Sequence, residues 1–377
     1  MQPLPLPLPS QQPRIGLVMI VKDEAAVIQR ALLSAKPCIN TWLIVDTGST
    51  DSTKELILQT MSDISGHLLE RPWVNFGHNR SEALALCDPH MDWAIMLDAD
   101  DNLAGTQIPA ELFAKHNLDG LVMRIQHEFI WHQRVQVFRT GRGWYYKGII
   151  HEHPFCGSTE KPLLGLLPPE TYMVTRCEGV RSRNPNKYRD DAALLEAEYS
   201  RNPTDSRNLF YLAQSYRDAG DRTAARICYA KYLDISSGVW PQERYIALLN
   251  LVQLFDLTPV NAALHMQLAW EALDICPDRV EVPFATARIR RAHGIPPTRQ
   301  LYALLAATPN RKPDLNAMFV NPAIYEWGMD DELAVVAFET GHYREAYEAS
   351  LRCMLHAPTE EMRGNARRNA IAAKALS

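Results

Sequence analysis

The most informative stretch of the sequence is TWLIVDTGSTDST, residues 41–53. It begins as an uninterrupted apolar run of strand length and ends in an acidic turn of small residues. A similar apolar run, IGLVMIV, occupies residues 15–21. Residues 92–101, DWAIMLDADD, also contain an apolar run that is followed by acidic residues. Segments with helical spacing separate these runs, at 22–35, 54–61 and 76–87. Alternating strands and helices predict an α/β fold with a Rossmann-like parallel sheet that is buried on both faces.

Three of the predicted strands are followed by polar turns. These turns are Lys22–Glu24, Asp46–Ser49 and Asp98–Asp101. In an open α/β sheet, ligands bind beyond the carboxyl ends of the strands. We therefore expect the three turns to converge on one site.

The pattern changes after residue 120. Polar and apolar residues alternate over 121–153, which is typical of β-strands, and the Thr-Gly-Arg-Gly stretch at 140–143 is interpreted as a hairpin turn. A short strand at 171–177 and a basic loop containing Arg181, Arg183, Lys187 and Arg189 follow.

From residue 190 onward the sequence is helical throughout. Large, small and aromatic residues recur with tetratricopeptide spacing, first at Leu209, Leu212, Ala213, Tyr216, Gly220, Ala225 and Tyr229, then at Leu333, Ala334, Gly341, Ala346 and Pro358. Weaker helical patterns lie between them, around 243–256, 261–275, 281–293 and 298–306. We expect three parts: a Pro-rich tail at 1–14, an α/β domain at 15–189 and a tetratricopeptide-like helical repeat domain at 190–377. An unrelated helical bundle is the alternative for the last part.

Composition limits the class of protein. The chain has 377 residues, 46% of them hydrophobic and 22% charged, with a formal net charge of −5, which fits a globular protein of about two domains. Seven cysteines form no Cys-x-x-Cys pair, which argues against a disulfide framework or a zinc knuckle. No apolar run is long enough for a transmembrane segment. The expected location is cytoplasmic. The tail at 1–14 is expected to be a disordered polyproline-II segment, with a docking ligand as the alternative.

The carboxylates that follow the strands indicate a chemistry. Asp98 and Asp100 are two residues apart, so in an extended segment both face one ligand. A divalent cation carrying a diphosphate would relieve their repulsion, because hard oxygen ligands suit Mg²⁺ or Mn²⁺. Asp46 can accept hydrogen bonds from a base or ribose, and Asn79 and Arg80 can face a diphosphate. A solvated acidic turn, a helix cap at Ser49 or Thr50 and a structural Arg80 ion pair are the alternatives.

In this order and spacing, the motifs MIVKDEAAVIQRAL, LIVDTGSTDST, GHNRSEALALC and WAIMLDADD resemble a glycosyltransferase of family 2 with the GT-A fold. FRTGRGWYYKGIIHEH and NLFYLAQSYRDAGDRTAA resemble the branch that joins this domain to tetratricopeptide repeats. The resemblance implies a nucleotide-sugar site, and its expected members are Asp23, Glu24, Asp46, Gly48, Ser49, Asn79, Arg80, Asp98 and Trp144. It also implies a Mn²⁺ or Mg²⁺ site made by Asp100 and His151. Glu152 is the expected catalytic base, with Asp190, Asp191 and Glu178 as alternatives.

The resemblance implies a metal-dependent inverting transferase. The donor would be a nucleoside-diphosphate sugar, expected to be a UDP-sugar, and the acceptor a peptide, a saccharide or a modified nucleobase. Arg124, Arg139 and Arg142 are further candidates for holding the diphosphate. The repeats would bind the acceptor or a partner protein, or form a homodimer. Two alternatives stay open: a repeat-based adaptor or scaffold whose transferase domain is inactive, and a nucleotidyltransferase, which would release pyrophosphate.

Overall fold

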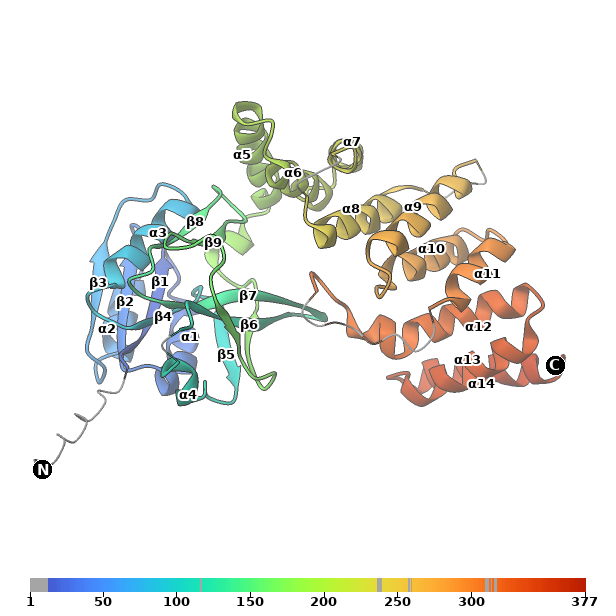
Figure 1. Cartoon of the computed structure of the whole chain (residues 1–377), viewed down its shortest axis with the longest axis horizontal. Helices are drawn as coiled ribbons and strands as arrows, with labels where there is room; N and C mark the ends of the chain where they lie inside the picture. Colours follow the sequence, from blue (N-terminus) through green and yellow to red (C-terminus); the bar gives the residue numbers. More distant parts are fainter. Residues whose placement is uncertain are drawn as a thin grey trace, which may run out of the picture. The chain divides into compact units, whose positions relative to one another are not determined.

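The computed structural model describes residues 13–115, 117–235, 239–256, 258, 260–308, 312, 314 and 317–377. The Pro-rich tail expected at 1–14 therefore lies outside the described residues, apart from its last two. The chain divides into two compact units. The first ends at Lys187 and leaves out the short segment Phe129–His132, which groups with Tyr188–Ser377 in the second unit. Figure 1 draws both units and labels most of their helices and strands.

The first unit is built on one large mixed sheet. Its strands are β1 Ile15–Val21, β2 Thr41–Asp46, β3 Gly66–Glu70, β4 Trp93–Met96, β5 Asp101–Gly105, β6 Gly120–His127, β7 Ile130–Arg139, β10 Leu164–Leu166 and β11 Thr171–Thr175. The strand order is β3-β2-β1-β4-β7-β6-β11-β5, and β10 also pairs with β6. The pairs β1–β2, β2–β3 and β1–β4 are parallel, as predicted, whereas β4–β7 and β5–β11 are antiparallel.

Helices cover both faces of the parallel part. They are α1 Ile28–Ala35, α2 Thr53–Thr60 and α3 Phe76–Cys87, and a fourth, α4 Ala110–Phe113, is short. Buried side chains of α1 and α2 pack with Leu17, Met19 and Ile44 on one face of the sheet. Buried side chains of α3 pack with Val18 and Leu43 on the opposite face. Burial on both faces explains why the strands are apolar without alternation.

A separate two-stranded sheet lies on the α3 side. Its strands are β8 Trp144–Lys147 and β9 His153–Cys156. The turn expected at 140–143 does link β7 to β8, but β8 pairs with β9, so the predicted hairpin between the strands flanking that turn is wrong. Trp144 and Tyr146 instead turn inward and pack with Phe138 in the α3 core.

Apart from the segment Phe129–His132, where Trp131 forms an antiparallel bridge with Val320, the regular structure of the second unit is helical. Its helices are α5 Lys187–Arg201, α6 Ser206–Asp218, α7 Arg222–Leu233, α8 Pro241–Leu254, α9 Ala262–Ile275, α10 Glu281–Ala292, α11 Arg299–Ala306, α12 Met329–Glu339, α13 Tyr343–His356 and α14 Glu360–Lys374. Neighbouring helices pack in pairs, as in α6–α7 and α12–α13. Gly220 and Gly341 join these pairs, each with φ of +83°, a conformation that glycine adopts without strain. The predicted α/β domain followed by tetratricopeptide-like helices is confirmed.

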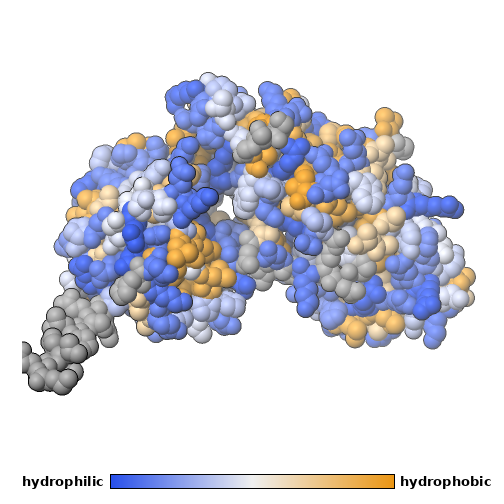
Figure 2. Space-filling view, in the orientation of Figure 1, coloured by the Kyte–Doolittle hydropathy of each residue, from blue (hydrophilic) through white to orange (hydrophobic). Residues whose placement is uncertain are grey.

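The visible surface is mainly hydrophilic, with hydrophobic residues in separate patches (Figure 2). Within the described chain, no helix is both long and apolar enough to cross a membrane.

Candidate functional site

Asp46 ends β2 with a carboxylate that is completely buried. Its Oδ1 accepts hydrogen bonds from the backbone N–H groups of Gly48 at 2.9 Å and Ser49 at 2.8 Å. Its Oδ2 is buried and has no hydrogen-bond partner among the described residues. A buried acceptor that lacks a donor costs free energy, so this oxygen is suited to an incoming N–H or O–H group. Gly48 has φ of +107° and open space where a Cβ would stand, which lets a ligand approach the backbone.

The turn after β1 is tied to the turn after β2. The N–H of Asp23 donates to Ser49 Oγ at 2.9 Å, and Asp23 Oδ1 accepts from the Thr50 N–H at 2.7 Å. The N-cap of α2 is Ser52, whose side chain makes no capping hydrogen bond, and Asp51 accepts from the N–H of Thr53, so the alternative of a helix cap at Ser49 or Thr50 is wrong. Two of the three strand ends are thus joined by direct hydrogen bonds.

The turn after β4 reaches the same place, because its Asp100 lies close to Glu24 of the turn after β1. A Cβ built on Gly179 would stand 3.0 and 3.1 Å from the two oxygens of Glu24 and 3.3 Å from Asp100 Oδ2, so these oxygens gather around one point. Burial, followed by the charges of Asp100 and Asp98, raises the pKa of Glu24 to about 7, although the Val180 N–H and Arg183 oppose the shift. The predicted convergence of the three turns is confirmed.

Asp101 adds a further buried carboxylate that the sequence analysis did not single out. It is 1% exposed, and its Oδ1 has no partner among the described residues. Burial and the neighbouring Asp98 raise its pKa to about 7. In the acid cluster, defined here as Glu24, Asp98, Asp100 and Asp101, burial and mutual repulsion therefore favour the protonated form of Glu24 and Asp101.

Arg80 forms an ion pair with this cluster. It lies in the second turn of α3, is 7% exposed, and donates to Asp98 Oδ1 at 2.5 Å and to Glu152 Oε1 at 2.6 Å. Burial disfavours its charge, but the carboxylates of Asp98 and Glu152 outweigh that effect and raise the pKa of Arg80. The same ion pair lowers the pKa of Asp98 despite burial. The structural ion pair that the sequence left open for Arg80 is therefore present.

The expected metal ligands are only partly assembled. No three His, Cys, Asp or Glu side chains of the described residues lie close enough together to hold a metal ion, so Asp98, Asp100 and His151 do not form a ready-made set. His151 is exposed with φ of +52°, and Asp98 already pairs with Arg80. The carboxylate oxygens of Glu24 and Asp100 are of the kind that Mg²⁺ and Mn²⁺ prefer, but the described residues place no third His, Cys, Asp or Glu ligand with them.

Several other side chains that were expected to contact the donor instead bind other parts of the protein. Asn79 is fully buried, and its amide bonds the backbone of Val74 and Pro72, so it holds a loop instead of facing a diphosphate. The Trp144 indole N–H donates to the Asp119 carbonyl and the ring is 7% exposed, which leaves little surface for stacking on a sugar. Arg142 pairs with Asp119 at 3.0 Å.

The remaining candidates are placed as follows. Arg139 donates to the Lys115 carbonyl and covers the Trp93 ring. Glu178, an alternative base, pairs with Arg30 at 2.5 Å. Asp190 and Asp191, the other alternative bases, lie in α5 of the second unit.

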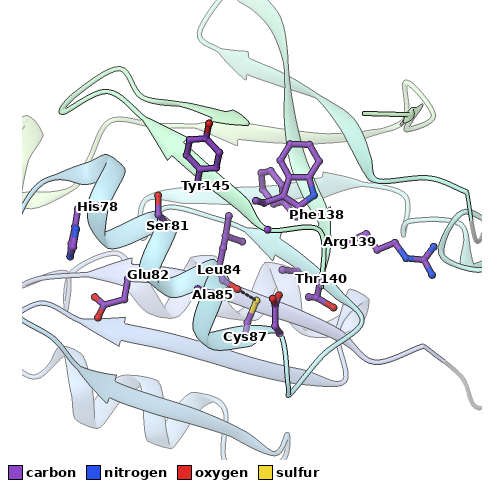
Figure 3. A pocket seen from close by; sticks show the side chains of 14 residues that line it. His78, Ser81, Glu82, Leu84, Ala85, Cys87, Phe138, Arg139, Thr140 and Tyr145 are labelled. Atoms are coloured by element: carbon purple, nitrogen blue, oxygen red, sulfur yellow. Dashed lines mark hydrogen bonds between the residues drawn. The ribbon is translucent and has the colours of Figure 1, made fainter. Parts of the chain in front are cut away.

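A hollow of about 420 Å³ lies between α3 and residues of β7 and β8 (Figure 3). Its wall includes Ser81 and Ala85 of the helix, and Trp144 and Tyr145 of β8. Cys87 also borders it, and burial raises the pKa of that thiol to about 12, so it is unreactive near neutral pH. Arg80, Asp46 and the acid cluster are not among the lining residues. This hollow is thus separate from the carboxylate site.

Sequence reasoning missed the turn that covers the acid cluster. The Gly179 N–H donates to Asp100 Oδ2 at 3.0 Å, and the Val180 N–H donates to Glu24 Oε2 at 3.3 Å. Both contacts join residues far apart in the chain through backbone donors, which leave no residue-type pattern. The only sequence hint was the glycine before the basic loop.

Part of the chain matches a known protein family. Residues 17–148, which include Asp46, Arg80 and the acid cluster, match the family described as Glycosyl transferase family 2. This segment is thus similar to glycosyl transferases of family 2. The match ends just before His151 and Glu152, so it says nothing of those two residues.

Two curated relatives each match less than a third of the chain. An "Uncharacterized glycosyltransferase" of Rickettsia felis is 33% identical over 109 residues, which is 28% of this chain and 36% of that protein. A "TPR repeat-containing protein" of Synechococcus elongatus is 32% identical over 115 residues, 29% of this chain and 27% of that protein. The matched part thus spans about a third of the relatives' own length.

Solved structures give only distant similarity. TarS residues 1–349 of S. aureus in complex with UDP-GlcNAc has a TM-score of 0.35 and 12% identity, covering 75% of this chain and 92% of that one. A TPR protein of Thermus thermophilus has a TM-score of 0.30 and 14% identity, covering 49% and 92%.

Proposed function

We propose that this protein transfers a sugar from a nucleoside-diphosphate sugar, with UDP as the nucleotide, to an acceptor. The observation that carries the proposal is the buried, unpartnered Oδ2 of Asp46 at the end of β2. A base N–H or ribose O–H would satisfy this oxygen, while Gly48 leaves room for the nucleoside against the backbone. The glycosyl transferase family 2 match over the same residues supports this donor class.

The acid cluster and Arg80 supply the electrostatics of the proposed reaction. Glu24 and Asp100 would hold Mn²⁺ or Mg²⁺, which lowers the basicity of the diphosphate leaving group when it is bound. Arg80, fixed by Asp98 and Glu152, places a permanent positive charge beside the cluster. We propose an in-line displacement with inversion at the anomeric carbon, as the family resemblance implies.

The ion pair with Arg80 favours a role for Glu152 other than that of catalytic base, which was expected from the sequence. Its side chain is 10% exposed and paired with Arg80, so taking a proton from an acceptor would break a buried ion pair. We assign Glu152 as a positioning residue for Arg80. We propose that the acceptor is a peptide, a saccharide or a modified nucleobase and that the helical unit binds it or a partner protein.

The Asp46→Asn substitution tests the proposal. The amide would keep an oxygen for the N–H groups of Gly48 and Ser49 but put a donor where Oδ2 stands. UDP binding, measured by calorimetry on the full chain, should weaken by about tenfold or more, as expected for losing a hydrogen bond to a charged acceptor. A panel of other nucleoside diphosphates tests the base, and hydrolysis of UDP-sugars tests activity.

Asp88→Asn is the matched control. Asp88 also accepts a backbone N–H, from Gly141 at 3.1 Å, but it borders the hollow beside α3. It should bind UDP like the wild type. Equal UDP affinity in the Asp46→Asn variant and the wild type would contradict the proposed donor site.

A further inference from the structure

A second arginine, Arg134 of β7, lies beside the acid cluster. The antiparallel register of β4 and β7 pairs Ile95 with Val137. Continued by three positions, this register brings Arg134 opposite Asp98, just beyond the end of β4. Burial raises the pKa of Asp98, but the charges of Arg80 and then Arg134 outweigh it and lower that pKa. The strand register and the charge interaction therefore place Arg134 at the same end of β4 as the cluster.

The side chain of Gln136 holds Arg134 in a fixed orientation. Gln136 is 2% exposed, and its Nε2 donates to the carbonyl of Met96, the last residue of β4, at 2.8 Å. Its Oε1 accepts from Arg134 Nε, also at 2.8 Å. A chain of two hydrogen bonds thus connects the end of β4 to the guanidinium. Because a buried amide keeps its hydrogen-bond partners, this chain limits the rotation of the Arg134 side chain.

The two terminal nitrogens of Arg134 are available to a ligand. Neither has a hydrogen bond or ion pair with any residue that the structure describes. Both reach solvent, because neither is one of the buried polar atoms that lack a partner. The Asp98 side chain is 35% exposed, so solvent reaches this side of the cluster as well. A guanidinium that is fixed at Nε and open at both Nη atoms can bind two oxygens of a phosphate group.

The other arginines considered for the diphosphate are less suited to it. Arg80 is 7% exposed, and two of its three nitrogens already bind Asp98 and Glu152. Arg139 and Arg142, which the sequence analysis favoured, bind parts of the protein outside the cluster. The donor in the proposed function carries its negative charge on the diphosphate, which therefore needs a cation with free N–H groups.

We propose that Arg134 binds the diphosphate of the nucleotide donor through its two terminal nitrogens, and that Gln136 is the positioning residue that orients it. The inference rests on the proposed function and assigns the phosphate-binding side chain within it. A guanidinium held in this way would offset the negative charge that grows on the diphosphate as it leaves.

The Arg134→Gln substitution tests the phosphate contact. UDP binding, measured by calorimetry on the full chain, should weaken by about tenfold or more, as expected for losing hydrogen bonds between charged groups. Uridine has no phosphate, so its binding, followed by ligand-observed NMR, should not change. Arg139→Gln, in the same strand, is the matched control and should bind UDP like the wild type. Unchanged UDP affinity in Arg134→Gln, or equal losses for UDP and uridine, would overturn the inference.

The Gln136→Leu substitution tests the positioning role. It removes both hydrogen bonds but keeps the charge of Arg134, so the affinity for UDP should fall severalfold and that for uridine should stay the same. Added to Arg134→Gln, the same substitution should cause no further loss, because no guanidinium is left to orient. A further loss of UDP affinity in the double variant would contradict the positioning role, since a general structural defect would persist there.

The Asp46→Asn variant separates this inference from the proposed donor site. Asp46 is proposed to contact the nucleoside, so Asp46→Asn should weaken the binding of UDP and uridine alike, whereas Arg134→Gln should weaken that of UDP alone. If Asp46→Asn weakens UDP binding and Arg134→Gln does not, only the present inference is wrong. A wild-type protein that binds no UDP would contradict both.

Discussion

At the scale of single residues, Arg80 is the strongest test of the site's electrostatics. It is buried between Asp98 and Glu152, so Arg80→Met would leave two carboxylates without their cation. Breaking a buried ion pair costs about 3–5 kcal/mol in the free energy of unfolding, which urea denaturation measures. Arg344→Ala is the control, because Arg344 is 89% exposed and its pair with Glu348 is worth less than about 0.5 kcal/mol. Similar losses in both variants would contradict a structural role for the buried pair.

The residues that could be predicted from sequence are those whose roles are local. Asp46 was found because a carboxylate after an apolar strand, followed by Gly48 and Ser49, is a pattern within four positions. The pairing of Arg80 with Glu152 joins residues 72 positions apart, and a hydrogen bond from the Gly179 backbone depends on no residue type. Spacing along the chain carries no information on such contacts.

At the scale of elements, the close approach of α3 to the end of β8 supports the Arg80 site. A Cβ on Gly77 would stand 2.2 Å from the Gly148 carbonyl oxygen, which is backbone and cannot turn away. Gly77→Ala should therefore destabilise the protein by about 1–3 kcal/mol, the cost of overpacking, and weaken UDP binding, because Glu152 follows Gly148 closely.

Gly364→Ala in α14 is the matched helix control for this prediction. Only the flexible end of Arg368 comes within 4 Å of its Cβ position, at 3.9 Å. Replacing a helical glycine by alanine in open space should raise the free energy of unfolding by up to about 1 kcal/mol. Urea denaturation of the two variants measures both changes in the free energy of unfolding. A stabilised Gly77→Ala variant would show that the contact with Gly148 is not rigid.

Elements were predicted well where their periodicity is strong. The helices expected around 243–256, 261–275, 281–293 and 298–306 correspond to α8–α11 within a few residues, because buried faces repeat along each helix. The partner of β8 was predicted wrongly, since short strands in a hairpin-rich segment have several possible partners and only tertiary packing selects β9.

At the scale of the whole molecule, an α/β part followed by a helical part is predicted from the sequence, because the alternation of strands and helices gives way to helical spacing alone. What the pattern could not show is that Phe129–His132, at the start of β7, groups with the helical unit. There Trp131 exchanges two backbone hydrogen bonds with Val320, each of 2.9 Å. A contact between residues so far apart in the chain depends on the folded arrangement alone.

The stability of the helical unit should respond to acid through His265 in α9. Both ring nitrogens are buried without a partner among the described residues, and burial, with a smaller effect of His293, lowers the pKa of His265 below its usual value. Below about pH 6.5 the unfolded chain binds a proton at His265 more readily than the folded unit does. The free energy of unfolding therefore falls as the pH drops through that range.

The His265→Leu substitution should remove the contribution of His265 to this pH dependence. It should also raise the free energy of unfolding at pH 8 by about 1–3 kcal/mol, because it eliminates an unsatisfied buried polar group. Denaturation between pH 5 and 8 measures both effects, with exposed His356→Gln as the control. A pH slope that is the same in His265→Leu and the wild type would mean that another group causes the acid sensitivity.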